Sequence, residues 1–361
     1  MLLYGLFTTP VALGGGAVVE GSVTGEAHSN LRGGLAVGTR FLDNVDVGVS
    51  IDGDEMFGVD GLALFGDVLY DNGASIAELT GAAQGTSNIE APRALRRYEL
   101  WAEQTLGAHA VRGGFMDLNA EFDTVASASL FLTPSAAISS TLAYTGKNGP
   151  SIFPNAALGV RYRGTSDKFT GQVAVFEGTP GDPSAPERSV LRWSADEGVL
   201  GIGQLQWAGG RVQQAAIGAW GYGHDRLASR GPVGPDAGAY ALLDAVLVGD
   251  LTGGPALAGW ARGGVANPSV ALVDEYGGAG LVLTSPFGEK VAGSFGVAVT
   301  TAHLSAGGVE TILEGTARAA LGRTFALQPD AQLLIHPGGD PAIPTAFTIG
   351  ARVDVAWSSA P

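Results

Sequence analysis

Cysteine is absent from the 361-residue chain. The protein therefore has no disulfide, no thiolate metal site and no cysteine nucleophile. Basic residues are also scarce, because 20 Lys and Arg stand against 35 Asp and Glu and give a formal net charge of −15. Phosphate recognition needs a clustered excess of positive charge, so this balance argues against a nucleic-acid partner.

The chain also lacks an unbroken apolar run long enough for a membrane helix, which needs about twenty residues. The uncharged stretch over residues 1–19 is interrupted by Thr8, Thr9, Pro10 and the glycines at 14–16. A secretory signal begins with basic residues, but no Lys or Arg precedes Arg32. We expect residues 1–15 to form a mature periplasmic N-terminal segment, with a remnant of a signal as the alternative.

Motifs for catalysis or metal binding are missing as well. The sequence contains no phosphate-binding loop, no His-Glu-x-x-His, no nucleophile elbow and no complete calcium loop. Asp52 and Asp54 flank Gly53, but the series of ligands stops there, which favours a polar turn. We therefore expect no cofactor, no metal and no enzymatic activity.

Glycine, in contrast, is abundant at 57 residues, while charged residues make up only 15% of the chain. This composition favours strands and turns over surface helices. The segment 347–357 alternates strictly: Phe347, Ile349 and Val353 share one face, while Arg352 and Asp354 share the other. About ten such residues, tilted in a bilayer, span the hydrocarbon core. The pattern predicts a strand with one face toward lipid.

The same alternation recurs at residues 158–163 and 327–335, but a soluble β-sandwich would alternate too. The connections discriminate better. Tight turns such as Gly107 are interleaved with mostly longer segments, including 117–154, 178–198 and 223–238. Short turns on one rim and long loops on the other are typical of an outer-membrane barrel, with the short turns in the periplasm. We expect the segment 117–154 to fold partly into this barrel, because its phenylalanines are unsuited to a freely exposed loop.

The predicted fold is all-β: a transmembrane antiparallel β-barrel of about 16 strands, formed by residues 16–357 and followed by a tail at 358–361. Two points stay open: Asp43 and Asn44 could form a turn that splits one strand, and 138–146 could be an additional strand. The candidate strands cover residues 16–27, 33–52, 60–70, 95–106, 108–116, 155–163, 168–177, 199–207, 210–222, 239–249, 255–263, 272–284, 290–302, 309–321, 324–336 and 345–357.

Charged and aromatic residues on the polar strand faces are the candidate pore lining. A Trp among charges makes little sense toward lipid, whereas its ring offers a flat apolar face to a sugar and its neighbours offer hydrogen bonds. The alternative is that Trp101 belongs to an interfacial aromatic girdle, as we expect for Trp207, Trp220 and Trp357. The candidates are Arg97, Glu99, Trp101 and Glu103 on one face of one strand, Trp260 and Arg262 on another, and Arg112, Arg161, Arg163, Glu310, Glu314, Arg318 and Gln332 elsewhere.

Several short motifs occur in one order over residues 95–357. They are Arg97-Tyr98-Glu99-Leu100-Trp101-Ala102-Glu103-Gln104, Val111-Arg112-Gly113-Gly114, Glu121-Phe122, Phe153-Pro154-Asn155-Ala156-Ala157-Leu158-Gly159-Val160-Arg161, Leu327-Gln328-Pro329-Asp330-Ala331-Gln332, Pro337-Gly338-Gly339 and Ile349-Gly350-Ala351-Arg352. Through these motifs the chain resembles the OprB-type carbohydrate-selective porins. The resemblance implies a sixteen-stranded barrel, diffusion of glucose and related sugars, and a constriction of Arg, Glu and Trp side chains with inward-folded loops.

Three functions compete at this point. The leading hypothesis is a passive pore for monosaccharides and related small carbohydrates in the Gram-negative outer membrane, surrounded by lipid and lipopolysaccharide, as a monomer or a homo-oligomer. The first rival is a general or cation-preferring porin, which would show a ring dominated by Asp and Glu. The second is a barrel enzyme or a soluble secreted β protein, which would need a catalytic constellation or a polar exterior.

Overall fold

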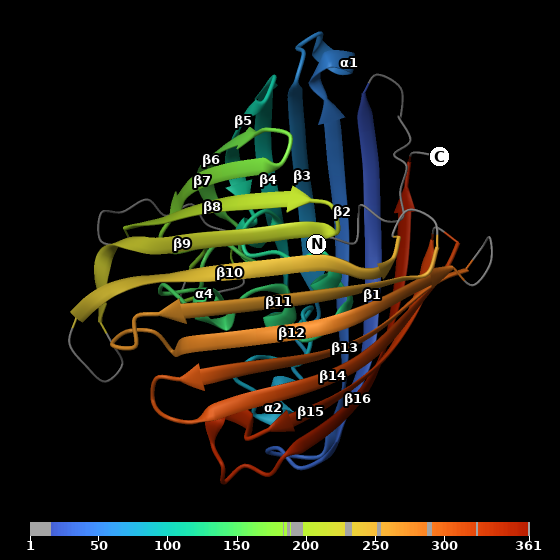
Figure 1. Ribbon diagram of the computed structural model, residues 1–361, viewed down its shortest axis with the longest axis vertical. Helices are drawn as coiled ribbons and strands as arrows, with labels where there is room; N and C mark the ends of the chain where they lie inside the picture. The colour runs from blue at the N-terminus through green and yellow to red at the C-terminus, as the bar shows by residue number, and fades with distance from the viewer. Residues whose placement is uncertain are drawn as a thin grey trace.

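The computed structural model describes residues 16–359, except 183, 186–187, 189–197, 228–232, 251–253, 287–290 and 323. Sixteen strands form one closed barrel in which each strand pairs with its sequence neighbours and β1 pairs with β16 (Figure 1). All pairings are antiparallel, so the predicted fold class and strand number are confirmed. The expected N-terminal segment 1–15 lies outside the described residues.

Each strand overlaps one predicted segment, but three strands extend five or six residues further than predicted, and two of these occupy most of the connection expected at 223–238. The strands are β1 (Ala17–Arg32), β2 (Gly38–Asp52), β3 (Leu62–Asp71), β4 (Ala94–Leu106), β5 (His109–Met116), β6 (Ala157–Thr165), β7 (Phe169–Glu177), β8 (Val199–Gly209), β9 (Val212–Leu227), β10 (Val233–Gly249), β11 (Ala256–Ala266), β12 (Val273–Pro286), β13 (Val291–Leu304), β14 (Val309–Leu321), β15 (Phe325–Ile335) and β16 (Ala346–Ser358).

The helices are all short and lie in the connections. They are α1 (Gly53–Phe57), α2 (Ala77–Thr80), α3 (Pro134–Ala137), α4 (Ser140–Ala143) and the 3-10 turns η2 (Leu118–Ala120), η3 (Ser127–Leu130) and η4 (Pro337–Gly339). Within the described ranges, none has the length and apolar character needed to cross a bilayer. Asp52 caps α1 by accepting hydrogen bonds from the backbone N–H groups of Asp54 and Glu55, so this acidic stretch is a polar turn as expected.

The structure resolves both points that the sequence left open. Asp43 and Asn44 lie inside β2, where they pair with Gly25 and Thr24 of β1, so no turn divides that strand. The segment 138–146 contains α4 and is not a strand. The predicted strand 33–52 was drawn too long, because residues 33–37 form the turn before β2. Gly33 and Gly34 there have φ of 67° and 66°, a backbone conformation that glycine adopts without strain.

The connections differ between the two rims. On the rim near the C-terminus most are short, as at residues 107–108 and 210–211, although 53–61 contains α1, while the opposite rim carries the longer segments 72–93 and 117–156 (Figure 1). Later connections on that opposite rim, such as 305–308, are short as well. In an outer-membrane barrel the rim of short turns is periplasmic.

The strand faces divide as the alternation predicts. Along β16, Ile349 on the outer face is 43% exposed, whereas Arg352 on the inner face is 3% exposed. On β6, Val160 faces outward and Arg161 inward, and β15 shows the same division. A lipid-facing band of apolar side chains thus surrounds an interior that holds the charged residues.

The connection 117–156, hereafter the inserted loop, lies inside the barrel. Its Phe122, Phe131 and Leu142 are each at most 1% exposed and pack into one apolar cluster with inward-facing wall residues. The wall contributes Ala174, Phe176, Leu200, Ile202, Ala216, Trp220, Tyr240, Leu242, Trp260, Val282 and Ala298, from β7 to β13. Burial of these side chains away from water fixes the loop against that half of the wall.

Candidate functional site

A group of charges on the inner wall is built by three neighbouring strands. Antiparallel pairing places Glu103 of β4 directly opposite Arg112 of β5, and Arg112 directly opposite Arg161 of β6. Directly opposed residues hold their Cβ atoms about 5 Å apart, so long side chains of opposite charge meet. The Glu103 carboxylate lies 2.8 Å from Arg112 Nε, 2.6 Å from Arg161 Nη2 and 3.5 Å from Arg163 Nη2.

The inserted loop adds a second carboxylate. Glu121 lies 2.8 Å from Arg112 Nη1 and 2.5 Å from Arg161 Nε, so the two glutamates clamp these arginines between them. The amide of Gln172 on β7 donates to the Glu121 carbonyl at 2.7 Å and holds the loop at this position. Glu103, Arg112, Glu121, Arg161 and Arg163 are hereafter the charge cluster.

The charge cluster carries three guanidinium groups and two carboxylates, so its formal charge is positive by one. Arg161 is almost fully covered, with its side chain 1% exposed, while the side chain of Arg163 is 35% exposed. Arg163 is therefore the most exposed arginine of the charge cluster. The sequence predicted four of the five members. Glu121 was not proposed, although its Glu-Phe motif was one of those that carried the family resemblance.

Trp101 lies beside this cluster on the inner face of β4. The Arg112 guanidinium stacks over its ring, 3.7 Å from the centroid, and the Phe65 ring lies 5.4 Å away. A guanidinium over an indole face is a cation–π contact. Trp101 therefore orients Arg112 as well as adding apolar surface, and it lies among inward-facing groups.

The expectation that Arg97 shares a face with Trp101 is wrong. The pairing of β3 with β4 shifts register between Gly66 and Val68, which inserts an additional residue in β4. Such a bulge reverses the facing of every side chain beyond it. Arg97 accordingly lies on the outer face, where its guanidinium covers the Phe115 ring at 3.5 Å.

Glu99 faces inward and binds the backbone of the inserted loop. Its carboxylate accepts a hydrogen bond from the backbone N–H of Asp117 at 2.8 Å, where the inserted loop begins. Its own N–H donates to the Asp67 carboxylate at 2.5 Å. Glu99 is thus tied by its hydrogen bond to the entry of the inserted loop.

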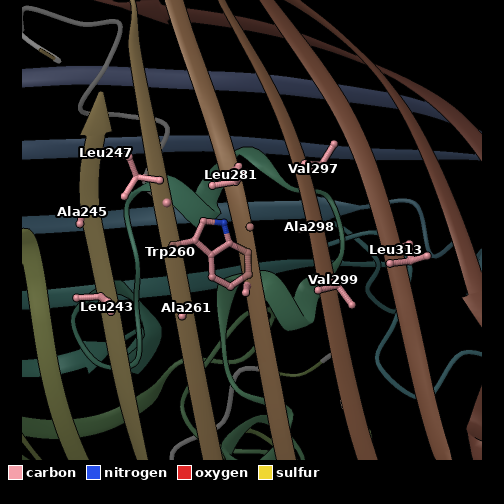
Figure 2. A pocket seen from close by; sticks show the side chains of 13 residues that line it. Leu243, Ala245, Leu247, Trp260, Ala261, Leu281, Val297, Ala298, Val299 and Leu313 are labelled. Atoms are coloured by element: carbon pink, nitrogen blue, oxygen red, sulfur yellow. The ribbon is translucent and has the colours of Figure 1, made fainter. Parts of the chain in front are cut away.

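Trp260 and Arg262 also face inward, under the inserted loop. Trp260 is 3% exposed and contacts Phe131 of the loop at a ring distance of 5.8 Å. On the outside it underlies a shallow hollow of about 560 Å³ among apolar side chains such as Leu247 and Leu281 (Figure 2). The inserted loop therefore covers the inner side of its ring.

Arg262 lies 3.7 Å from the carboxylate of Asp123, and both side chains are fully buried. Burial raises the pKa of the Asp123 carboxyl, and the Arg262 charge opposes that shift. Asp123 also accepts a hydrogen bond from the backbone N–H of Ser139 at 2.8 Å. This hydrogen bond holds two parts of the inserted loop together.

The remaining candidates lie on β14 and β15. Glu310, Glu314 and Gln332 face inward, but backbone groups of the long connections cover them. Arg318 forms an ion pair with Asp354 of β16. The structure therefore divides the predicted residues among a group near β4–β6, a pair on β11 beneath the inserted loop and a separate row on β14–β15.

The expected aromatic girdle needs one correction. Trp207 and Trp357 lie on the outer face near the periplasmic rim, in accordance with the prediction. Trp220, in contrast, faces inward and is 4% exposed within the apolar cluster beneath the inserted loop. The facing of Trp220 could not be predicted from alternation, because the inner face of the barrel wall is also apolar on this side.

A closed barrel of sixteen antiparallel strands with an apolar exterior, a charged inner wall and an inserted loop is the architecture of an outer-membrane porin. The family model described as carbohydrate-selective porin, OprB family, matches residues 37–357, and the chain belongs to this family. Its location is accordingly the Gram-negative outer membrane. Comparison with curated protein sequences gives no significant match.

Solved structures show the same fold at low sequence identity. The high-pH structure of OprB from Pseudomonas putida is similar with a TM-score of 0.83 and 16% identity, covering 95% of this chain and 94% of that one. OmpF from Salmonella typhi, in a complex with daunomycin, gives a TM-score of 0.60 at 10% identity over 97% and 100%. The anion-selective porin from Comamonas acidovorans gives 0.59 at 12% identity over 94% and 99%.

Proposed function

We propose that this porin conducts monosaccharides and related small carbohydrates by passive diffusion past the charge cluster. The family supports carbohydrate as the class of solute. The observation that carries the proposal is the meeting of Trp101, Arg112 and Glu103 on the inner wall. Guanidinium groups donate to sugar hydroxyls, carboxylates accept from them, and aromatic surface contacts the C–H faces of the ring.

Within this proposal each side chain has a role. Arg163, which is partly exposed, meets the solute first, and Arg112 offers a second donor whose position is fixed by Trp101 and the two glutamates. Because every carboxylate in the cluster is already paired, its charge is nearly balanced. A balanced surface favours neutral, hydroxyl-rich solutes over ions.

A general or cation-preferring porin is the second candidate function. It is favoured by the inner wall of β1–β3, where Glu20, Asp46 and Asp67 lie close enough for mutual repulsion. A confined path lined by such groups selects for cations by its electric field.

One experiment separates the two functions. Proteoliposomes containing the purified barrel are tested for uptake of glucose and of glycine, and a planar bilayer under a KCl gradient gives the cation-to-anion permeability ratio. A sugar pore takes up glucose faster than its size predicts and shows a permeability ratio near one. A strong cation preference with uptake governed only by solute size would support the general porin.

We place the apolar outer band in contact with outer-membrane lipid and lipopolysaccharide, because only an apolar environment tolerates it. The barrel closes within a single chain, so each copy contains a complete path. Assembly into a homo-oligomer would leave that path unchanged.

A further inference from the structure

Four buried polar side chains form a row on the inner wall opposite the charge cluster. Glu310 and Glu314 lie on β14, and Gln328 and Gln332 lie on β15; the members on each strand are four residues apart and so share the inner face. Glu314 and Gln332 are direct cross-strand partners. All four are at most 4% exposed. They are hereafter the anchor row.

Two members of the anchor row hold the inserted loop. The Glu314 carboxylate accepts hydrogen bonds from the backbone N–H groups of Leu132 at 2.6 Å and Thr133 at 3.0 Å. The Gln328 amide donates to the Leu130 carbonyl at 2.6 Å. Glu314 accepts from two consecutive backbone N–H groups, so it is the principal anchor of this stretch.

The other two members hold the connection 72–93, hereafter the second loop. The Glu310 carboxylate accepts from the backbone N–H groups of Ala83 at 2.7 Å and Gln84 at 2.8 Å. It also accepts from Gly338 at 2.6 Å and so ties in the connection before β16. The Gln332 amide donates to the Thr86 carbonyl at 2.9 Å.

The two loops also bind each other. The Asn88 amide donates to the Phe131 carbonyl at 3.3 Å, and the Thr133 hydroxyl donates to the Gly85 carbonyl at 3.3 Å. The Tyr144 hydroxyl donates to the Ala83 carbonyl. The loops therefore form one body that is fixed to β14–β15 at one side, while Glu121 reaches Arg112 and Arg161 at the other.

We propose that the anchor row sets the width of the solute path by holding both loops, with Glu314 as its principal positioning residue. This inference depends on the proposed function only for the identity of the solute. Glu314 touches no part of the charge cluster and acts on it through the inserted loop. Loss of this anchor lets residues 130–133 leave the wall and widens the path.

The first test replaces Glu314 by Gln, which keeps the side-chain shape but offers an amide where two backbone N–H groups need acceptors. Because conductance follows the open cross-section of an aqueous pore, we expect single-channel conductance to rise about twofold. The matched control is Glu20→Gln on the inner face of β1, which removes one lumenal carboxylate without removing a loop hydrogen bond described above and therefore measures the effect of the lost charge alone. The heat-dependent mobility of the barrel in SDS gels verifies folding of both variants.

The second test restores the loop position by another bond. The Ser135 hydroxyl of the inserted loop donates a hydrogen bond to the Thr300 hydroxyl of β13 at 3.1 Å, so the two side chains point toward each other and are suitable positions for a cysteine pair. Since the chain has no cysteine of its own, the pair Ser135→Cys and Thr300→Cys gives a single disulfide. In the Glu314→Gln background, the oxidised protein should return to the parental conductance, and reduction should raise conductance again.

Equal conductance of folded Glu314→Gln and the parent would overturn the inference. A raised conductance that the disulfide does not correct would also overturn it, because the change would then come from charge and not from loop position. These outcomes are independent of solute identity. Should the parent transport glucose and glycine alike, the sugar proposal fails while the conductance result still decides the role of Glu314.

Discussion

Glu121 of the inserted loop and Arg161 of β6 form a two-point ion pair, with N···O distances of 2.5 and 2.7 Å. The ion pair joins the inserted loop, which is not part of the sheet, to the middle of strand β6. Since Arg161 also binds Glu103, the loop position and the charges of the wall are coupled.

Replacing Glu103 by Gln should make the pore prefer anions. Glu103 is shared by Arg112, Arg161 and Arg163, so its loss raises the formal charge of the cluster from plus one to plus two. The anion-to-cation permeability ratio should increase about twofold, because one fixed charge is removed from a confined aqueous path. The reversal potential under a KCl gradient measures it. An unchanged ratio would place the cluster away from the ion path.

Replacing Trp101 by Ala should reduce glucose transport more than glycine transport. The variant loses the cation–π contact with Arg112 and the apolar ring surface, about 1 kcal/mol or roughly a fivefold effect on glucose affinity. Competition uptake into proteoliposomes gives that affinity. The control is Trp207→Ala, which changes an outward-facing Trp. If both solutes change by the same factor, Trp101 has no specific role toward sugars.

Replacing Arg161 by Met should destabilise the barrel strongly. Arg161 is a buried ion-pair partner of both Glu103 and Glu121, and the substitution removes it from both. Breaking a buried pair costs about 3–5 kcal/mol. Arg163→Met should cost much less, because the Arg163 side chain is 35% exposed and its pair is longer. Urea unfolding in lipid vesicles, followed by tryptophan fluorescence, compares the two. Similar losses for both variants would contradict the burial argument.

Cysteine labelling should separate the two strand faces on β6. A cysteine in place of Arg163 should react with a water-soluble, membrane-impermeant thiol reagent, whereas a cysteine in place of Val160 should react only with a lipid-soluble one. Neither site competes with a native thiol, because the chain contains no cysteine. The reverse pattern would invert the facing of this strand.

Much of the fold could be predicted from sequence because strand alternation is a local property. The run from Phe347 to Trp357 gives both the strand and its lipid face without reference to any other segment. The start of β2 was predicted five residues too early, because a glycine-rich turn and a glycine-containing strand look alike in sequence.

The site was only partly accessible to the same reasoning. Glu103, Arg112 and Arg161 could be proposed because each lies on a polar face of a regular strand. The facing of Arg97 could not, because the bulge in β4 depends on its pairing with β3. Glu121 and the covered state of Glu314 depend on how the inserted loop crosses the interior, which no local pattern encodes.

The pairing of β1 with β16 has a consequence for how the barrel is made. Thr24 donates a hydrogen bond to Asp354 across a sequence separation of 330 residues, so this seam joins the first strand to the last. Until the C-terminal strand arrives, β1 presents a row of unpaired backbone groups, a form prone to pairing with other chains. Contacts of such separation form late and slowly. The whole chain must therefore be exported, and kept from pairing with other chains, before the barrel can close. Truncation at the C-terminus should leave an open, aggregation-prone sheet.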